Sequence, residues 1–210
     1  MKRILITLFL VLPLTVAAKS KDDSKYLAGA VPEVDGQIVF SKSFSVTGKT
    51  QEEILSVLGA WADGLVEASI PAPGNYARIM ESTDSSIVAR VCEWLVFLKK
   101  PLYLDRARLR FQMDVNVEGD HVSISAYTLT YYYSEDNDGE NGQLIKAEEW
   151  ISDKEALNKA QTKLYPKSAK FRRRTVDRME SLFESAMDAF TPTEEAAPVE
   201  KPVRQGIVED

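Results

Sequence analysis

The stretch that decides the fold runs from Arg106 to Tyr133 and reads RARLRFQMDVNVEGDHVSISAYTLTYYY. Apolar and polar side chains alternate along both of its halves, which is the period-2 pattern of a β-strand with one buried face. A two-residue turn at Gly119-Asp120, with glycine first as a type II′ turn prefers, would place the apolar residues of both strands on one side. The facing apolar pairs are then Val117–Val122, Val115–Ile124 and Met113–Ala126. A turn at Glu118-Gly119 would misalign them, so the pattern predicts the register of a long antiparallel hairpin.

The same register decides what lies on the opposite face of the hairpin. The pairs predicted there, from the turn outward, are Asn116–Ser123, Asp114–Ser125, Gln112–Tyr127, Arg110–Leu129, Arg108–Tyr131 and Arg106–Tyr133. One interpretation of the arginines and tyrosines is a solvated sheet face that is stiffened by stacked pairs. The other is a contact surface for an anionic ligand or a partner, because interfaces are enriched in arginine and tyrosine. The candidate contact residues are Arg106, Arg108, Arg110, Tyr127, Tyr131 and Tyr133.

Outside the hairpin, the apolar pattern predicts further strands and three helices. Thr50 and Glu53 form a capping box, in which each side chain satisfies a free backbone N–H of the first helical turn. The predicted elements, in chain order, are a half-buried strand over residues 37–46, a helix from Thr50 to about Ala68, shorter strands between Arg78 and Lys100, a short helix opened by Ser152, and a last helix from Ser168 to Phe190. The long helices have one apolar face each, which predicts packing against a sheet.

A run of cations stands near the start of the last predicted helix, at Lys170, Arg172, Arg173 and Arg174. Cations at a helix N-terminus oppose the helix dipole, so this run needs compensating negative charge. One interpretation is an internal network of salt bridges, for which the nearest acids in the sequence are Glu148, Glu149, Asp153 and Glu155. The other interpretation is a candidate anion patch, open to an anionic ligand or a membrane surface.

The composition excludes several kinds of site. The chain has 210 residues, a net charge of -6, one Cys and one His. Cys92 therefore cannot form an intramolecular disulfide, and with His121 it supplies too few ligands for structural zinc. A calcium loop starting at Asp136 would need glycine and glutamate where Asn141 and Ala147 stand. We expect no metal, no cofactor and no assigned catalytic residue, and the acidic balance argues against a nucleic-acid partner.

The two ends of the chain differ in composition from the rest. Residues 1–18 combine a basic start, a short apolar run and small residues at a cleavage point, which is typical of a secretory signal peptide. This predicts export, to the periplasm of a Gram-negative bacterium or outside the cell, with no membrane span after cleavage. Residues 19–33 are expected to be loose, and residues 191–210 to be a disordered acidic tail. Residues 34–190 are then one domain.

Several longer segments carry a resemblance to a known family. They are Glu93-Trp94-Leu95-Val96-Phe97, Leu104-Asp105-Arg106, Tyr131-Tyr132-Tyr133, the run AEEWISDK at 147–154 with ALNK at 156–159, and KFRRRT at 170–175. They resemble a family of exported bacterial proteins, the domain of unknown function numbered four-four-six-eight, which is described as having a TBP-like fold. The likeness covers roughly residues 34–190. It implies an α+β fold, an antiparallel sheet with helices on one face, in agreement with the predicted elements, and it implies no catalytic or ligand residue.

The sequence therefore favours an uncharacterised exported protein with a non-enzymatic binding role. Its partner would be an envelope protein or an anionic ligand, held on the exposed face of arginines and tyrosines. Two alternatives stay open. A metal-independent enzyme would use a carboxylate or His121 as its base. A structural or assembly factor of the cell envelope would use the acidic tail as a tether.

Overall fold

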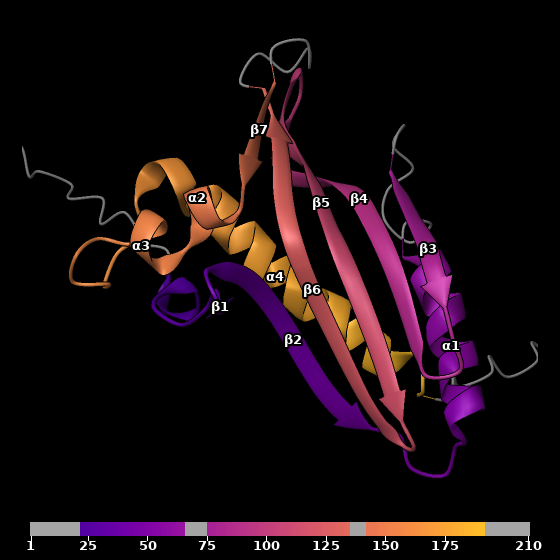
Figure 1. Cartoon of the computed structure of the whole chain (residues 1–210). Helices are drawn as coiled ribbons and strands as arrows, with labels where there is room; N and C mark the ends of the chain where they lie inside the picture. The colour runs from indigo at the N-terminus through magenta and orange to yellow at the C-terminus, as the bar shows by residue number, and fades with distance from the viewer. Residues whose placement is uncertain (1–21, 66–74, 135–141, 192–210) are drawn as a thin grey trace, which may run out of the picture.

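An antiparallel sheet of seven strands is the frame of the described structure, which comprises residues 22–65, 75–134 and 142–191 of a computed structural model (Figure 1). The strands are β1 (Glu33–Val34), β2 (Gln37–Ser45), β3 (Tyr76–Ser82), β4 (Ser86–Lys100), β5 (Tyr103–Glu118), β6 (His121–Tyr133) and β7 (Gln143–Lys146). Their order across the sheet is β1-β2-β6-β5-β4-β3, and β7 pairs with the end of β6 that β2 leaves unpaired. The helices are the 3₁₀ turn η1 (Ser24–Tyr26), α1 (Gln51–Gly64), α2 (Glu148–Ile151), α3 (Asp153–Ala156) and α4 (Pro166–Asp188).

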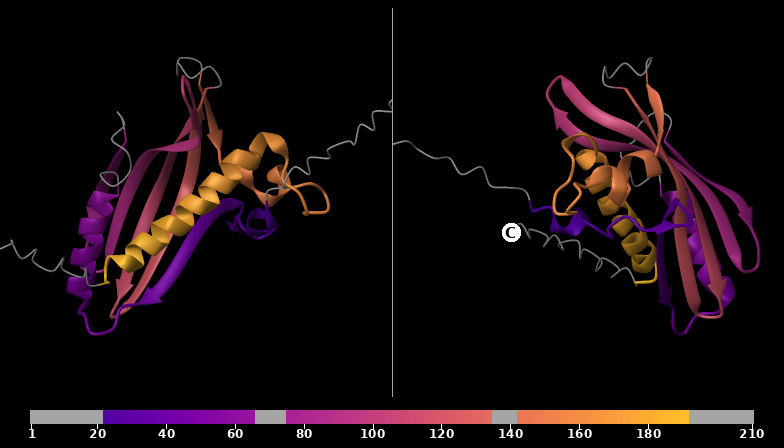
Figure 2. Two further views of the ribbon diagram at one scale, coloured as in Figure 1. Left: turned by 180° about the vertical axis from the view of Figure 1, so that it is seen from behind. Right: turned by 60° about the vertical axis from the view of Figure 1, so that its left-hand side comes forward.

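The two long helices, α1 and α4, cover the same face of the sheet (Figure 2). Each contributes the apolar residues of one side to a shared core, with Leu58 of α1 and Leu182 of α4 both fully buried. The indole Nε1 of Trp61 in α1 donates a hydrogen bond of 3.0 Å to the hydroxyl of Ser185 in α4, which ties the helices together. This arrangement confirms the α+β class with helices on one face. The opposite face of the sheet, which we call the open face, has neither long helix on it.

The capping box of α1 is present as predicted. The Glu53 amide donates to the Thr50 hydroxyl at 3.3 Å, and the Thr50 amide donates to the Glu53 carboxylate at 2.7 Å. The start of α4 differs from the prediction, because the helix begins at Pro166, two residues before the expected cap. Proline suits this position since its missing N–H is not needed in the first turn. Ser168 is buried inside the helix and its hydroxyl donates to the carbonyl of Tyr165.

The register of the β5–β6 hairpin is confirmed near the turn and wrong beyond it. Every predicted pair from Val117–Val122 to Gln112–Tyr127 is present, and Gly119 has the positive φ of 62° that a type II′ turn requires at its first position. The register then shifts by one residue at a β-bulge, where Thr128 has a φ of 54°. Because the bulge inserts one extra residue in β6, Leu129 and every second residue after it face the core.

The segment that precedes the sheet is attached to α4, although residues 19–33 were expected to be loose. The fully buried guanidinium of Arg172 donates to the carbonyl of Tyr26 at 2.6 Å and to that of Leu27 at 2.7 Å. The side chain of Val31 is buried in the core. These contacts correct the expectation of a loose segment for residues 22–33. The sequence near this segment gives no sign of them, because Arg172 is about 145 residues away in the chain.

Three predicted features lie outside the described residues. They are the signal peptide of residues 1–18, the tail beyond residue 191, and most of the acidic stretch tested for calcium. None of the helices in the described part of the chain combines the length and the apolar character needed to traverse a bilayer.

Candidate functional site

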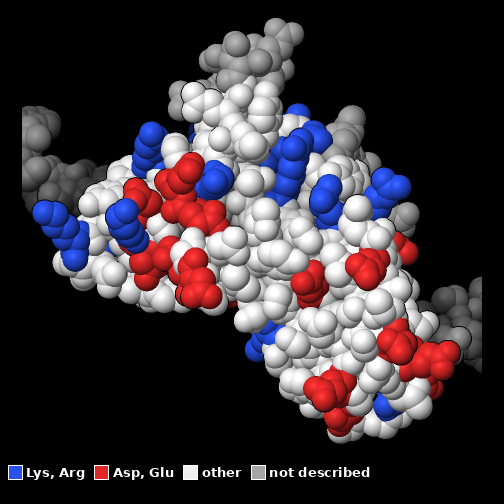
Figure 3. All heavy atoms as spheres, viewed as in Figure 1, with Lys and Arg blue, Asp and Glu red and all other residues white. Residues whose placement is uncertain are grey.

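The open face of the sheet gathers basic side chains from four strands. On β5, the buried residues Ala107 and Leu109 face the core, so the alternate arginines face outward. Strand pairing then places the cations of neighbouring strands beside them. The resulting group, which we call the arginine face, consists of Arg78 on β3, Arg90 on β4, Arg106, Arg108 and Arg110 on β5, and Lys146 on β7. In Figure 3, Lys and Arg side chains gather across the upper part of the molecule, whereas acidic side chains gather to the left and at the lower edge.

One indole organises part of this face. The guanidinium carbon of Arg106 lies 3.7 Å from the ring centroid of Trp94, and that of Arg108 lies 4.2 Å from it. Contact with the indole restricts the motion of both guanidinium groups. Guanidinium groups can form paired hydrogen bonds with planar anions such as carboxylates.

Four arginines of the arginine face have no counter-ion within the described part of the chain. None of the ion pairs found in the described part of the chain includes Arg78, Arg90, Arg106 or Arg110. Arg78 stands directly across from Arg90, where like charges destabilise a sheet. The nearby Asp114 accepts hydrogen bonds of 2.9 and 3.0 Å from the hydroxyl of Tyr127. Burial, and next this bond to Asp114, raise the pKa of Tyr127, which keeps its hydroxyl protonated.

The structure keeps four of the six predicted contact residues on the open face and moves two away from it. Arg106, Arg108, Arg110 and Tyr127 are on the face. Tyr131 is fully buried in the core, with its hydroxyl 2.6 Å from that of Thr175, and burial raises its pKa. Tyr133 lies on the helix side, where its hydroxyl donates to Asp105 at 3.1 Å. The cause is the bulge at Thr128, which puts Tyr132 instead of Tyr131 opposite Arg108.

The sequence pattern alone did not identify Arg78, Arg90, Trp94 and Lys146 as residues of the open face. Short turns at residues 83–85 and 101–102 join β3, β4 and β5, but the registers shift between Ile79 and Glu81 and between Val96 and Leu98. For Arg90 the sequence did contain a signal: it lies between the apolar residues Ala89 and Val91, both of which are buried, so alternation places Arg90 on the outward face. No local pattern predicts these shifts of register or the pairing of β7 with β6.

The candidate anion patch at the start of α4 is an internal network, so that prediction is corrected. Lys170 donates to Asp105 at 2.8 Å, and burial, which lowers its pKa, is outweighed by hydrogen bonds to Asp105 and Tyr133 that raise it. Arg172 is buried against Asp153, and Arg173 binds Asp23 at 2.6 Å. Only Arg174 is exposed.

Most of the acids that were expected to pair with this basic cluster do not contact it. Among Glu148, Glu149, Asp153 and Glu155, only Asp153 pairs with the cluster, while Glu148 accepts a hydrogen bond from the backbone amide of Ile38. The other partners come from the N-terminal segment and from β5. The salt-bridge interpretation is therefore right in kind, but its partners are distant in sequence.

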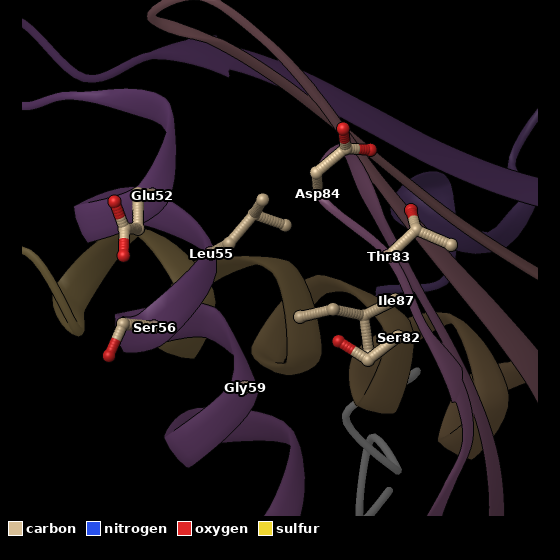
Figure 4. A pocket seen from close by; sticks show the side chains of 8 residues that line it. All are labelled: Glu52, Leu55, Ser56, Gly59, Ser82, Thr83, Asp84 and Ile87. Carbon is tan, nitrogen blue, oxygen red and sulfur yellow. The ribbon is translucent and has the colours of Figure 1, made fainter.

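A hollow of about 550 Å³ lies between α1 and the β3–β4 turn, and Figure 4 shows Glu52 and Asp84 on opposite sides of it. His121 is exposed beside the hairpin turn, and Cys92 is buried. Within the described ranges, no group of three or more His, Cys, Asp and Glu side chains is placed to hold a metal ion.

Comparison with known proteins gives one family and several solved structures, two of which are described below. The family model described as "Domain of unknown function (DUF4468) with TBP-like fold" matches residues 40–132. A crystal structure of a DUF4468 family protein from Bacteroides ovatus is 36% identical, with a TM-score of 0.72, and the match covers 83% of this chain and 98% of that one. A TBP-like protein from Parabacteroides distasonis is 19% identical, with a TM-score of 0.62 and coverage of 79% and 99%. A comparison with curated proteins gives no match.

Proposed function

Since the chain belongs to the DUF4468 family, whose description names a fold and no activity, we propose that it is a non-enzymatic binding domain that holds an anionic partner on its arginine face. The fold is no argument for DNA binding, because a shared topology does not carry a shared site. The proposal depends on the face itself.

One observation carries the proposal: one face of a protein whose net charge is -6 holds four arginines that take part in no ion pair within the described residues, namely Arg78, Arg90, Arg106 and Arg110. The basic side chains around α4 show the contrast, because Lys170, Arg172 and Arg173 each have a carboxylate partner. Repulsion between Arg78 and Arg90 lowers the stability of the free protein. A partner that brings negative charge would remove this cost on binding.

The chemistry of the face indicates the kind of partner. Arginines on β5 recur every second residue, about 7 Å apart, so they would meet an extended row of negative charges. Guanidinium groups form paired hydrogen bonds to carboxylates and phosphates. Trp94 and Tyr132 add aromatic surface between the arginines, as is common in binding interfaces. An acidic segment of an envelope protein or a smaller anionic ligand fits this description.

The test uses heparin as a soluble polyanion. We expect the wild-type chain to be retained on a heparin column and to elute with salt, although its net charge is negative. Replacing Arg90 and Arg110 together by Glu should abolish retention. Replacing Arg174 by Glu is the matched control, because Arg174 is an exposed arginine of α4 outside the arginine face. A wild-type chain that flows through, or a control that loses retention equally, would contradict the proposal.

We further propose that the protein works outside the cytoplasm, on the basis of the sequence of residues 1–18. Mass spectrometry of the N-terminus of the protein from its native cells provides the test. A mature chain that starts at residue 18 or 19 supports export. A chain that retains Met1 or begins at Lys2 refutes it.

A further inference from the structure

The turn between β4 and β5 has an unusual residue at its tip. Lys100 pairs with Tyr103, which leaves Pro101 and Leu102 as the two turn residues. Leu102 has a φ of 64°, as at the second central position of a type II turn, where glycine or asparagine is favoured. The side chain of Leu102 is also completely exposed, at 108% of its reference area. The chain therefore holds an apolar side chain in water at a backbone position that disfavours it.

The neighbours of Leu102 make the tip amphipathic. Leu98 and Tyr103 are exposed by 40% and 47%, and Lys99 and Lys100 are exposed beside them. We call these five residues the hairpin tip: Leu98, Lys99, Lys100, Leu102 and Tyr103. No ion pair within the described ranges includes either lysine. The tip thus combines uncompensated ammonium groups with exposed aliphatic and aromatic surface.

The hairpin tip is continuous with the arginine face. Moving along the hairpin from the tip, the next outward pairs are Val96 with Arg106 and Trp94 with Arg108. The tip is at the end of the sheet opposite the β5–β6 turn (Figure 1). Cations and aromatic rings therefore lie directly behind the apolar tip.

We propose that the hairpin tip inserts into the surface of a bilayer that contains anionic lipids. The proposal deepens the proposed function, on which it rests in part, because the arginine face would supply a second layer of contacts to lipid phosphates. Apolar side chains that protrude from a protein can enter the boundary between lipid head groups and acyl chains, because this boundary deforms to accommodate them. Tyrosine, tryptophan and lysine are the side chains that favour this boundary. Anionic head groups complement the lysines, which distinguishes this partner from an uncharged apolar pocket.

The test is cosedimentation with vesicles of phosphatidylcholine, with and without phosphatidylglycerol. We expect the wild-type chain to bind only the vesicles that contain phosphatidylglycerol. Leu102→Gly should weaken this binding roughly tenfold or more, which is the effect of withholding one leucine from an apolar environment. The double variant Lys99→Glu, Lys100→Glu should weaken it by at least about fivefold for each lysine.

The same set of variants includes controls for correct folding. Leu102→Gly relieves the positive φ, so this variant should melt at the wild-type temperature or above. Val34→Ser is the matched control, because Val34 is an exposed apolar residue on β1 and not part of the tip. It should bind vesicles as the wild type does.

The outcomes separate the two proposals. Wild-type retention on heparin without binding to anionic vesicles would overturn the lipid assignment and leave the proposed function intact. Vesicle binding that is unchanged in Leu102→Gly would overturn the role of the tip. Failure to bind both heparin and anionic vesicles would overturn both proposals.

Discussion

Replacing Arg172 by methionine should destabilise the protein strongly and release its N-terminal segment. The guanidinium is fully buried and donates to the carbonyls of Tyr26, Leu27 and Ile151 and to the carboxylate of Asp153. Methionine fills a similar volume but donates no hydrogen bond. The substitution would therefore leave several acceptors without their donor.

The magnitude follows from the loss of one partner of a buried charge pair, which costs about 3–5 kcal/mol. The Arg172 side chain has no exposed surface, whereas the Asp153 carboxylate that remains charged in the variant is 28% exposed, which favours the lower part of this range. For a chain of this size, each kcal/mol corresponds to a shift in melting temperature of about 2–4 °C. We expect the melting temperature to fall by roughly 10 °C.

The assay combines urea unfolding, followed by tryptophan fluorescence, with limited trypsin digestion at Lys25. The variant should unfold at lower urea and should be cut at Lys25 faster than the wild type under native conditions. Arg173→Met is the control, because Arg173 is 22% exposed and has one carboxylate partner, Asp23. Its cost should be about 1 kcal/mol or less. Equal urea midpoints for wild type and Arg172→Met, with equal cleavage at Lys25, would refute the reasoning.

Three further substitutions test the bulge, the core hydroxyl pair and the buried ion pair. Thr128→Gly should stabilise the fold by about 1 kcal/mol in urea unfolding because glycine accepts the positive φ, whereas Thr130→Gly should destabilise it. Burial raises the pKa of Tyr131 above its usual value of 10.0, so the unfolded state loses this proton first. Stability should therefore decline as pH rises above 10, and Tyr131→Phe should decline less steeply in thermal melts across that range; equal slopes would contradict the assignment. Arg178 donates from Nε to the carboxylate of Glu93 at 2.7 Å, so Glu93→Ala would leave Arg178 without its partner. This variant should lower the free energy of unfolding by about 3 kcal/mol in urea titrations.

The β5–β6 hairpin shows how far the sequence alone leads. From the turn to Gln112, alternation predicts every pair correctly, because burial of one face penalises any slip of one residue. The prediction fails at Thr128, where a strictly alternating strand would leave Leu129 on the open face. An apolar leucine at a position predicted to face outward was the signal for a bulge that the sequence contained. The position of the bulge places Tyr131 in the core, where its hydroxyl lies 2.6 Å from that of Thr175.

The basic run of α4 shows a second limit. Lys170, Arg172 and Arg173 lie near the start of α4 and need counter-ions, as the helix dipole predicts. The sequence does not identify these counter-ions, because Asp105 and Asp23 reach the cations only through the packing of distant segments. The same is true of Glu93, which pairs with Arg178 across the core although it belongs to an apolar strand.

The sequence by itself determined the α+β class, the first helix with its capping box, and the half of the hairpin nearest the turn. These features depend on contacts between residues near one another in the chain, where period and spacing are sufficient information. The tertiary structure alone decided where the β-bulges lie and therefore which residues share a face: Arg78, Arg90 and Lys146 lie with the arginines of β5, whereas Tyr131 faces the core. A bulge responds to packing across the core between segments that are distant in the chain, and that packing determines which charges share a face.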